Sequence, residues 1–368
     1  MKIGTMTKLI AENIAPPNVS NLTIFDGDIK ICEIPLGHLS LPNVGEKIYS
    51  TGIISDAHVT VSNNVNDSST DFPRALQCLD GISDFICSCG DGVDQGNTAN
   101  FQAYKNYIDS KAVYSVTGNH EMYTGGDPYK HDEETIKSLM RTYAKVPLYY
   151  TISSNPTTTL MNDGVIADGG NIYNASIKND DVFIMVGIAT DWSNFGTGGL
   201  QWLHETLDAN RNKRCFLFQH IRPDNASGNG ENLNWADLWM ESNAQAVVFE
   251  NLLKHYKNVY FFHGHSHFTF DLQTRTNNAN VDKIYGRYSI HIPSVTYPRG
   301  IPVTDADIEN GFSVLIRESQ GYLMEVYLKH IVLRGIDFVT GEFVPIAQYC
   351  LDTTIKTVES KPASYFGI

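Results

Sequence analysis

Residues 47–58 of this 368-residue chain read KIYSTGIISDAH, an apolar run that ends in the triplet Asp56-Ala57-His58. The β-branched and aromatic residues of the run favour a buried strand, because such side chains pack well on a pleated sheet. A carboxylate and an imidazole follow where this strand is expected to end, and strand ends are where an open α/β sheet presents its binding crevice. The stretch therefore predicts a core strand and the first residues of a functional site.

Similar apolar runs recur along the chain and alternate with helical patterns. Leu200, Leu203 and Leu207 have the spacing of an amphipathic helix, and so do apolar residues in 136–143 and 248–253. Strands that alternate with helices predict a layered α/β fold. The further apolar runs are 84–91, 112–121, 182–191, 214–220, 259–267 and 288–295.

The two flanks differ from this central part. Two alternating runs around Asp26-Gly27 predict a hairpin, which is either added to the main sheet or a separate appendage. Residues 311–339 alternate as consecutive antiparallel strands would, with a turn signal at Ser319–Gly321. A further hairpin signal at Asn179-Asp180 makes the sheets mixed rather than purely parallel. We expect an N-terminal β-hairpin extension over 1–45, a main domain over 46–335 and a C-terminal tail over 336–368.

Composition and charge argue against several function classes. The net charge of −14 leaves no surplus of Lys and Arg for broad contact with nucleic acid or anionic lipid, so a nucleic-acid partner is disfavoured. No apolar segment approaches the roughly 20 residues of a membrane span, and no signal-peptide pattern is present, so we expect a cytoplasmic protein. The six cysteines are dispersed, and Cys87 and Cys89 share one face of a strand, which favours buried thiols over metal ligands.

Polar residues follow most of the predicted strands in five short blocks. Carboxylate, imidazole and amide oxygen together suit first-row divalent ions such as Mn²⁺, Fe²⁺ or Zn²⁺. Any single block has an ordinary explanation, since a lone histidine such as His220 is usually a packed or exposed side chain. The order of the blocks, their glycines and their strand context join them into one predicted metal site. The blocks are Asp56-Ala57-His58, Gly90-Asp91, Gly118-Asn119-His120-Glu121, His220 and Gly264-His265-Ser266-His267.

In this order the blocks resemble the signature of the calcineurin-like metallophosphoesterase family, over roughly residues 46–300. The resemblance implies a four-layer α/β/β/α sandwich with mixed sheets, and an enzyme that hydrolyses phosphate mono- or diesters with two divalent ions. Asp91 would bridge the ions, since a shared carboxylate lets two cations approach to roughly 3.5–4 Å. One ion would be held by Asp56, His58, Asp91 and His267, and the other by Asp91, Asn119, His220 and His265.

The resemblance also implies catalytic roles. A hydroxide held between the ions attacks the phosphorus, because metal binding lowers the pKa of water to about 7. His120 binds no metal and assists the leaving group by donating a proton or stabilising charge. The protein Ser/Thr phosphatase branch has arginines where this chain has Gln95 and Thr117, so that branch is disfavoured.

Weaker features each have a functional and a structural interpretation. Arg222 and Arg299 are candidate phosphate contacts, because a guanidinium grips phosphate at two points, or members of structural ion pairs. Asp94 is either a partner of the ligand residues or a turn carboxylate. The loop 222–234 is either a lid over the site or an ordinary surface loop.

A different class of function competes with the enzyme. The flanking residues 11–37 and 333–353 resemble parts of phage- or prophage-encoded tail-associated proteins. That resemblance implies a virion-associated structural or binding protein that keeps the metallophosphoesterase scaffold. Trimers or larger assemblies in light scattering favour this interpretation, whereas a monomer favours a free enzyme. Substrate, native metals and oligomeric state are left open by the sequence.

Overall fold

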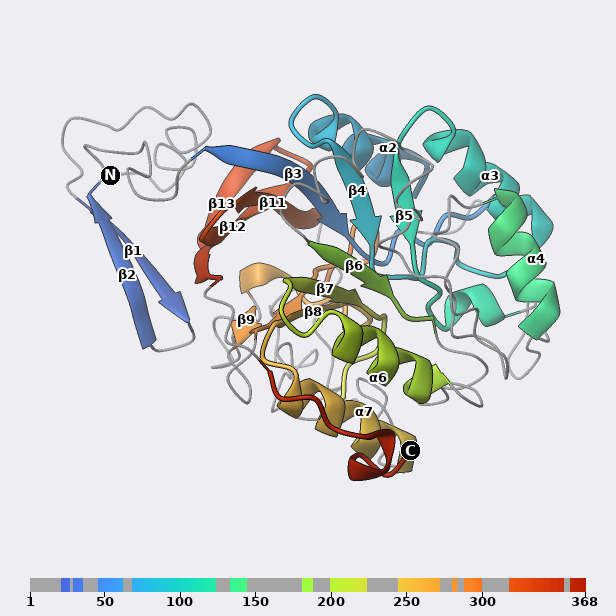
Figure 1. Ribbon diagram of the computed structural model, residues 1–368. Coiled ribbons are helices and arrows are strands. Elements are labelled where there is room, and N and C mark those ends of the chain that lie inside the picture. Colours follow the sequence, from blue (N-terminus) through green and yellow to red (C-terminus); the bar gives the residue numbers. More distant parts are fainter. Residues whose placement is uncertain are drawn as a thin grey trace, which may run out of the picture.

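The computed structural model shows two large sheets with helices around them, the mixed α/β architecture expected from the sequence (Figure 1). The predicted hairpin at Asn179-Asp180 and most of the predicted lid, 224–234, lie outside the described residues. The structure describes residues 21–26, 29–35, 46–61, 68–123, 133–143, 181–187, 199–223, 244–271, 280–282, 288–299, 318–353 and 358–368.

The first large sheet has six strands, of which β3, β4 and β5 run parallel. β11 pairs antiparallel with β3, and β12 and β13 continue the antiparallel half, so the sheet is mixed. In spatial order the strands are β13 (Glu342–Asp352), β12 (His330–Asp337), β11 (Gln320–Tyr327), β3 (Lys47–Ile54), β4 (Phe85–Ser88) and β5 (Val113–Ser115).

The predicted antiparallel strands in 311–339 are confirmed over the described part, but the turn lies elsewhere. β11 begins at Gln320, and the chain reverses at Leu328–Lys329 rather than at Ser319–Gly321. Gly321 lies within β11. A Cβ at this position would lie 2.7 Å from the carbonyl oxygen of Ile53 on β3, so a larger residue would not fit. Close approach of two strands, and not a turn, explains this glycine.

The second large sheet has five strands, and all but β9 run parallel. β9 pairs antiparallel with β10 at the edge of the sheet, so this sheet is mixed as well. In spatial order the strands are β6 (Val182–Met185), β7 (Cys215–Phe218), β8 (Val259–His263), β10 (Tyr288–His291) and β9 (Val281–Asp282).

Helices lie on the outer sides of the two sheets. Figure 1 shows α2, α3 and α4 beside the six-stranded sheet, and α6 and α7 beside the five-stranded sheet. The three helices predicted from apolar spacing are all present, as α4, α6 and α7. Their bounds are α2 (Ser68–Leu79), α3 (Thr98–Ile108), α4 (Glu133–Tyr143), α6 (Gly199–Ala209) and α7 (Ala244–His255).

The main core lies between the sheets and is rich in aromatic rings. Phe183 of β6 contacts Tyr49 of β3 and Phe85 of β4, with ring centroids 6.1 and 5.3 Å apart. Cys87 and Cys89 are fully buried in the same cluster, and burial raises the pKa of both thiols, as expected for packed side chains. The inward faces of both sheets are therefore apolar, which leaves the polar blocks to the strand ends.

The N-terminal hairpin is confirmed, and it forms a two-stranded sheet of its own. β1 (Asn21–Asp26) pairs antiparallel with β2 (Ile29–Pro35). At the other end, β13 lies within the segment predicted as a tail, and its pairing with β12 makes it part of the six-stranded sheet. Phe366, near the C-terminus, is buried against Tyr256, which directly follows α7. The division of the chain into domains stays a prediction.

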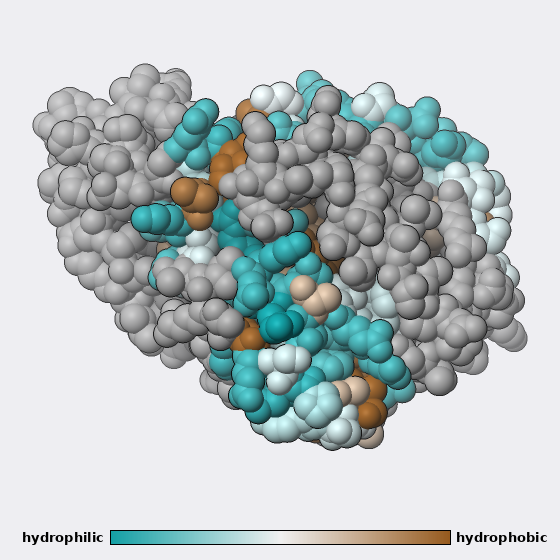
Figure 2. All heavy atoms as spheres, viewed as in Figure 1, coloured by the Kyte–Doolittle hydropathy of each residue, from teal (hydrophilic) through white to brown (hydrophobic). Residues whose placement is uncertain are grey.

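The described residues on the face shown in Figure 2 form no extended apolar area. Figure 2 shows mostly hydrophilic colours on the described part of the visible face, with small separate hydrophobic areas. Scattered apolar residues of this kind are normal on protein surfaces. Within the described ranges, none of the helices is both long and apolar enough to cross a bilayer.

Candidate metal centre

The carboxyl ends of parallel strands from both sheets meet at one edge of the molecule. Beyond β3 and β4 the backbone bonds continue, with Asp56 N–H donating to Gly90 O at 3.0 Å and His58 N–H to Asp91 O at 2.9 Å. Beyond β7 and β8, the N–H of Gly264 donates to the carbonyl of His220 at 3.0 Å. Each block therefore leaves its strand in register with its neighbour, and the predicted residues gather at this edge.

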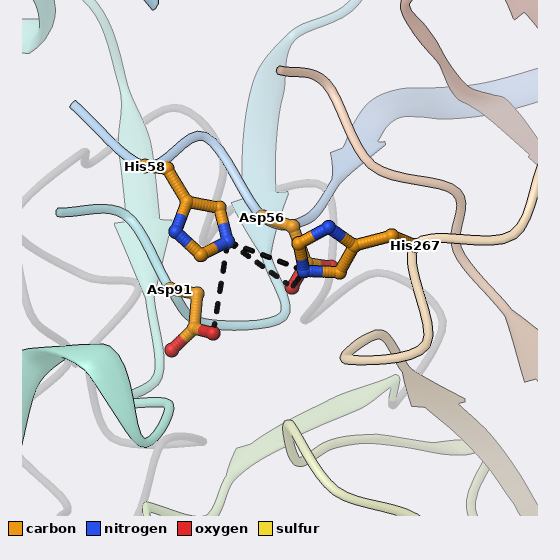
Figure 3. A group of neighbouring side chains, drawn as sticks. All are labelled: Asp56, His58, Asp91 and His267. Atoms are coloured by element: carbon orange, nitrogen blue, oxygen red, sulfur yellow. Dashed lines mark hydrogen bonds and ion pairs between the residues drawn. The ribbon is translucent and has the colours of Figure 1, made fainter. Parts of the chain in front are cut away.

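Four predicted residues form the first group, in which ligand atoms lie within 4.8 Å of one another: Asp56, His58, Asp91 and His267 (Figure 3). His267 Nε2 lies 3.2 Å from His58 Nε2 and 3.1 Å from Asp56 Oδ1. Two ligand atoms that each lie about 2.0–2.1 Å from one ion are separated by about this distance. The side chains come from three loops, so only the tertiary fold brings them together.

The second group contains Asp91, His220 and His265. His220 Nε2 lies 3.0 Å from Asp91 Oδ2 and 3.2 Å from His265 Nδ1. Asn119, the amide predicted for this group, follows β5, and its Oδ1 is buried without a hydrogen-bond partner. The next residue, His120, donates its backbone N–H to Asp91 Oδ1 at 2.8 Å, so the loop that carries Asn119 is held against Asp91.

Asp91 belongs to both groups, and its two oxygens have different surroundings. Oδ1 accepts the hydrogen bond from the His120 N–H. Oδ2 is buried and lies 3.0 Å from His220 Nε2 and 3.8 Å from His58 Nε2. This oxygen therefore lies between the two groups.

Backbone carbonyls orient three of the histidines. The Nδ1 atoms of His220, His267 and His120 lie 2.8, 3.1 and 2.8 Å from the carbonyl oxygens of Cys89, Tyr297 and Asp94, respectively. A carbonyl only accepts, so each Nδ1 carries a proton and Nε2 is the ring nitrogen turned away from the carbonyl. Such contacts fix ring orientation in metal-binding histidines. His220 and His267 therefore turn Nε2 toward Asp91 and Asp56, respectively.

The donor set fits divalent metal ions. Asn119 Oδ1 is buried without a hydrogen-bond partner, and such an atom is costly to leave unsatisfied. The buried Asp56 Oδ1 and Asp91 Oδ2 face the imidazoles of His267 and His220 at 3.1 and 3.0 Å. Together with converging imidazole nitrogens, they are the oxygen and nitrogen ligands that first-row divalent cations prefer. The observed arrangement is thus the one that bound cations would satisfy.

Electrostatics keep the two aspartates ionised. Burial alone would raise their pKa values, but neighbouring imidazoles, chiefly His267 and His220 for Asp56 and His220 for Asp91, hold both below the ordinary range. Burial likewise opposes charge on His220, yet Asp91 and Asp56 raise its pKa to about 9. In the metal-free protein, a proton on His220 therefore supplies positive charge at the place predicted for a metal.

Backbone strain is concentrated at this site. Among the described residues, those other than glycine with positive φ are all candidate ligands, and for L-residues that conformation is unfavourable. Strain of this kind persists only where the surrounding structure imposes it, and it clusters at functional sites. The residues are Asp56 (55°), His58 (42°), Asp91 (50°), His265 (73°) and His267 (61°).

Gly118 is required by close packing. A Cβ at this position would lie 2.1 Å from Asp91 Oδ1, so no other residue fits without moving the carboxylate. The sequence interpretation, a sharp exit from the strand, is therefore incomplete, since the glycine also makes room for the central aspartate.

Glu121 has a role that the sequence did not reveal. Its carboxylate accepts hydrogen bonds from the N–H groups of Gly92 at 2.6 Å and Gly118 at 2.7 Å, and longer ones from Asp91 and Val93. It thereby joins the loops that follow β4 and β5. The only available signal was its position in the Gly-Asn-His-Glu block, which gives no indication of contacts 28 to 30 residues away.

The structure distinguishes the functional from the structural interpretation for Asp94 and Arg222, and it locates Arg299. Asp94 Oδ1 lies 3.5 Å from His58 Nδ1, and its carbonyl faces His120, which favours the partner interpretation. Arg222 is fully buried, which favours a structural role because a substrate cannot reach an enclosed side chain. Arg299 donates its backbone N–H to the carbonyl of His267 at 2.8 Å, so it lies beside the site.

Comparison with known proteins places the chain in a family. No curated protein matches the chain. A solved structure, a conserved uncharacterized protein and predicted phosphoesterase from Streptococcus pneumoniae TIGR4, is similar with 10% identity and a TM-score of 0.35, over 83% of this chain and 97% of that chain. The model of the calcineurin-like phosphoesterase family matches residues 49–268, which contain all the polar blocks. The chain therefore belongs to the calcineurin-like phosphoesterase family.

Proposed function

We propose that this protein hydrolyses phosphate esters with two divalent metal ions bound at this centre. One observation carries the proposal: the buried Asp91 Oδ2 lies between two groups of ligand atoms, 3.0 Å from the His220 imidazole and 3.8 Å from the His58 imidazole. A carboxylate shared in this way lowers the repulsion between two cations. The proposed ligands are Asp56, His58, Asp91 and His267 for one ion, and Asp91, Asn119, His220 and His265 for the other.

The ligand residues prepare the centre before substrate arrives. Two such ions, when bound, polarise phosphoryl oxygens and supply a water that loses its proton near neutral pH. Asp56 and Asp91 are already ionised, and His220 and His267 are already oriented with Nε2 toward the centre, where His220 releases its extra proton when metal binds. Preorganisation of this kind means that little rearrangement accompanies binding or reaction.

His120 is the proposed partner of the leaving group. Its side chain is 29% exposed, in contrast to the buried ligand imidazoles, and its ring lies edge-on to His58 with centroids 4.4 Å apart. Because Nδ1 is held by the carbonyl of Asp94, Nε2 is the atom that takes up a proton and passes it to the departing oxygen. The imidazole therefore stands at the open side of the centre.

The proposed substrates are phosphate monoesters or diesters, and the proposed metals are Mn²⁺, Fe²⁺ or Zn²⁺. The same attack serves both ester classes. The mixture of imidazole and carboxylate ligands supports these metals over ions that prefer only oxygen.

Hydrolysis of p-nitrophenyl phosphate and of bis(p-nitrophenyl) phosphate tests the proposal. The protein is stripped with a chelator and reconstituted with Mn²⁺, and metal content is measured in parallel. We expect metal-dependent turnover that Asp91→Asn abolishes and that Asp109→Asn, an exposed carboxylate beside α3, leaves unchanged. The preferred compound separates monoesterase from diesterase. Absence of bound metal in the wild-type protein contradicts the proposal, and bound metal without turnover favours a scaffold role.

A further inference from the structure

One short loop contributes to both ligand groups. His267 belongs to the first group and His265 to the second, so the residue between them, Ser266, is placed to affect both. The two histidines at 265 and 267 have φ values of 73° and 61°, which an unconstrained loop avoids. Ser266 has no exposed surface, although it lies in a loop.

Ser266 is fixed from the interior by a histidine of the five-stranded sheet. Its Oγ lies 2.6 Å from Nε2 of His291, which is the last residue of β10 and is also fully buried. The backbone of His291 is held in turn, because it is in register with His263 of β8 and its N–H donates to the carbonyl of Asn280 at 2.8 Å. The position of His291 is therefore fixed by the sheet, and its imidazole holds the loop through Ser266.

The chemistry of the pair suits a permanent contact. Burial, helped by the nearby Arg222 guanidinium, lowers the pKa of His291 to about 3, so the imidazole is neutral. A neutral imidazole and a hydroxyl can each donate or accept, and a hydrogen bond inside a low-dielectric core is costly to lose.

Other hydrogen bonds of the loop each hold one of the two histidines. His265 N–H donates to Asp56 Oδ2 at 3.1 Å, and the carbonyl of His267 accepts from Arg299 N–H at 2.8 Å. The contact between Ser266 and His291 lies between these hydrogen bonds and involves neither ligand imidazole directly. It is thus placed to set the separation and orientation of both rings at once.

We propose that His291 is a positioning residue, which through the hydroxyl of Ser266 holds His265 and His267 in the geometry that binds both metal ions. The inference rests on the proposed function only in assuming that the two groups bind metal. It assigns no direct contact between His291 and metal or substrate. Loss of partners outside the ligand shell typically costs about 10–100-fold in metal affinity.

A metal-binding cycle tests the inference. Ser266→Ala, His291→Leu and the double variant are titrated with Co²⁺, whose visible absorption reports ligand geometry, and affinities are measured by calorimetry. We expect each single variant to bind metal about 10–100-fold more weakly with an altered spectrum. The double variant is expected to match the weaker single variant, because both changes remove one contact. His291→Gln, which offers a polar atom near the position of Nε2, should recover part of the affinity.

Ser289→Ala is the matched control. Ser289 also lies on β10, is equally buried, and contacts an imidazole, that of His263, at 3.3 Å, yet it is not connected to the ligand loop through Ser266. Thermal unfolding of every metal-free variant records the general cost of losing a buried hydroxyl. We expect Ser289→Ala to lower stability without changing metal affinity or the Co²⁺ spectrum.

Two failures are distinguishable. If the wild-type protein binds no metal, the proposed function fails first. If it binds two ions and Ser266→Ala and His291→Leu keep wild-type affinity and spectrum while losing only thermal stability, the pair is structural and the inference is overturned. The inference is also overturned if the control variant loses as much metal affinity as Ser266→Ala.

Discussion

At the scale of single residues, the centre combines three features that destabilise a folded protein: buried charges, a buried polar atom without a partner, and positive φ angles. The buried Asn119 Oδ1 lacks a hydrogen-bond partner, and Asp56 and Asp91 are ionised although fully buried. Both also have positive φ, as do His58 and two other candidate ligands. A fold retains such costs where bound cations or neighbouring hydrogen bonds offset them, and Glu121 supplies several of those bonds.

His120→Ala separates the leaving-group role from metal binding. We expect turnover to fall by about 10²–10⁴-fold, the usual contribution of a positioned acid or base, with metal content unchanged. Metal analysis together with kcat measured on a poor and a good leaving group checks this, and the poor leaving group should suffer more. His330→Ala, on β12, serves as the control for loss of an imidazole. Loss of metal in His120→Ala would contradict the assigned role.

Gly118→Ala tests the close packing around Asp91. The added Cβ would lie 2.1 Å from Asp91 Oδ1, so the carboxylate must move and metal affinity should fall by at least about tenfold. Gly341→Ala is the control for a glycine whose new methyl group meets no neighbour: its φ of 72° is unfavourable for alanine, but nothing lies within 4 Å of the added Cβ. That control should cost about 1 kcal/mol of stability with metal binding intact. Equal metal affinity in both variants would count against the packing argument.

At the scale of elements, the parallel strands supply the site and the antiparallel ones extend the sheet. β3, β4, β7 and β8 each end in candidate ligands, whereas β11, β12 and β13 carry none. At the opposite ends of the strands, a buried ion pair next to β6 and β7 of the five-stranded sheet accepts a hydrogen bond from the six-stranded sheet. Arg214 donates to Asp181 at 2.7 Å, and Tyr49 of β3 donates to the same carboxylate at 2.8 Å.

Arg214→Met should destabilise the protein by about 3–5 kcal/mol, because it leaves the carboxylate of Asp181 buried without its cation. Urea unfolding of the metal-free protein measures the loss. The double variant Arg214→Met/Asp181→Leu removes both charges and should recover most of it. Site geometry is expected to persist in the folded fraction, since neither residue contacts the metal groups. A double variant no more stable than the single one would show that the pair contributes more than charge compensation.

At the scale of the whole molecule, metal and protons compete for the same negative centre. In the metal-free protein the pKa of His220 is about 9, above its ordinary value of 6.5. The folded state therefore holds this proton more tightly than the unfolded chain does. The resulting stabilisation is complete below about pH 6.5 and is lost as the pH rises to about 9.

Metal removal should therefore make stability depend on pH. We expect the Tm of chelator-treated protein to fall between about pH 6.5 and 9, and the Tm of Mn²⁺-loaded protein to change little, because bound cations replace the proton. Differential scanning calorimetry of both forms in buffers of matched ionic strength checks this. Parallel profiles for the two forms would show that His220 does not share its position with a metal.

The sequence predicted elements well where the signal was local. Seven apolar runs are strands, and the Leu200 pattern is α6. α2 was not predicted although Phe72, Leu76 and Leu79 have helical spacing, because Pro73 interrupts the pattern. The turn at Ser319–Gly321 was placed wrongly for a different reason: a glycine required by a neighbouring strand has the same appearance in sequence as a glycine in a turn.

By itself the sequence determined the family signature, the alternation of strands and helices, and the chemical types of the candidate ligands, because each is encoded in a few consecutive residues. Only the tertiary structure decided which ligand atoms converge, and that Asp91 Oδ1 faces the His120 N–H while Oδ2 faces the His220 imidazole. It also decided that Glu121, Ser266 and His291 support the loops that carry the candidate ligands. Contacts between residues far apart in the chain depend on strand order and register across two sheets. No local pattern carries that information, since hydrogen bonds and burial arise only when distant segments pack together.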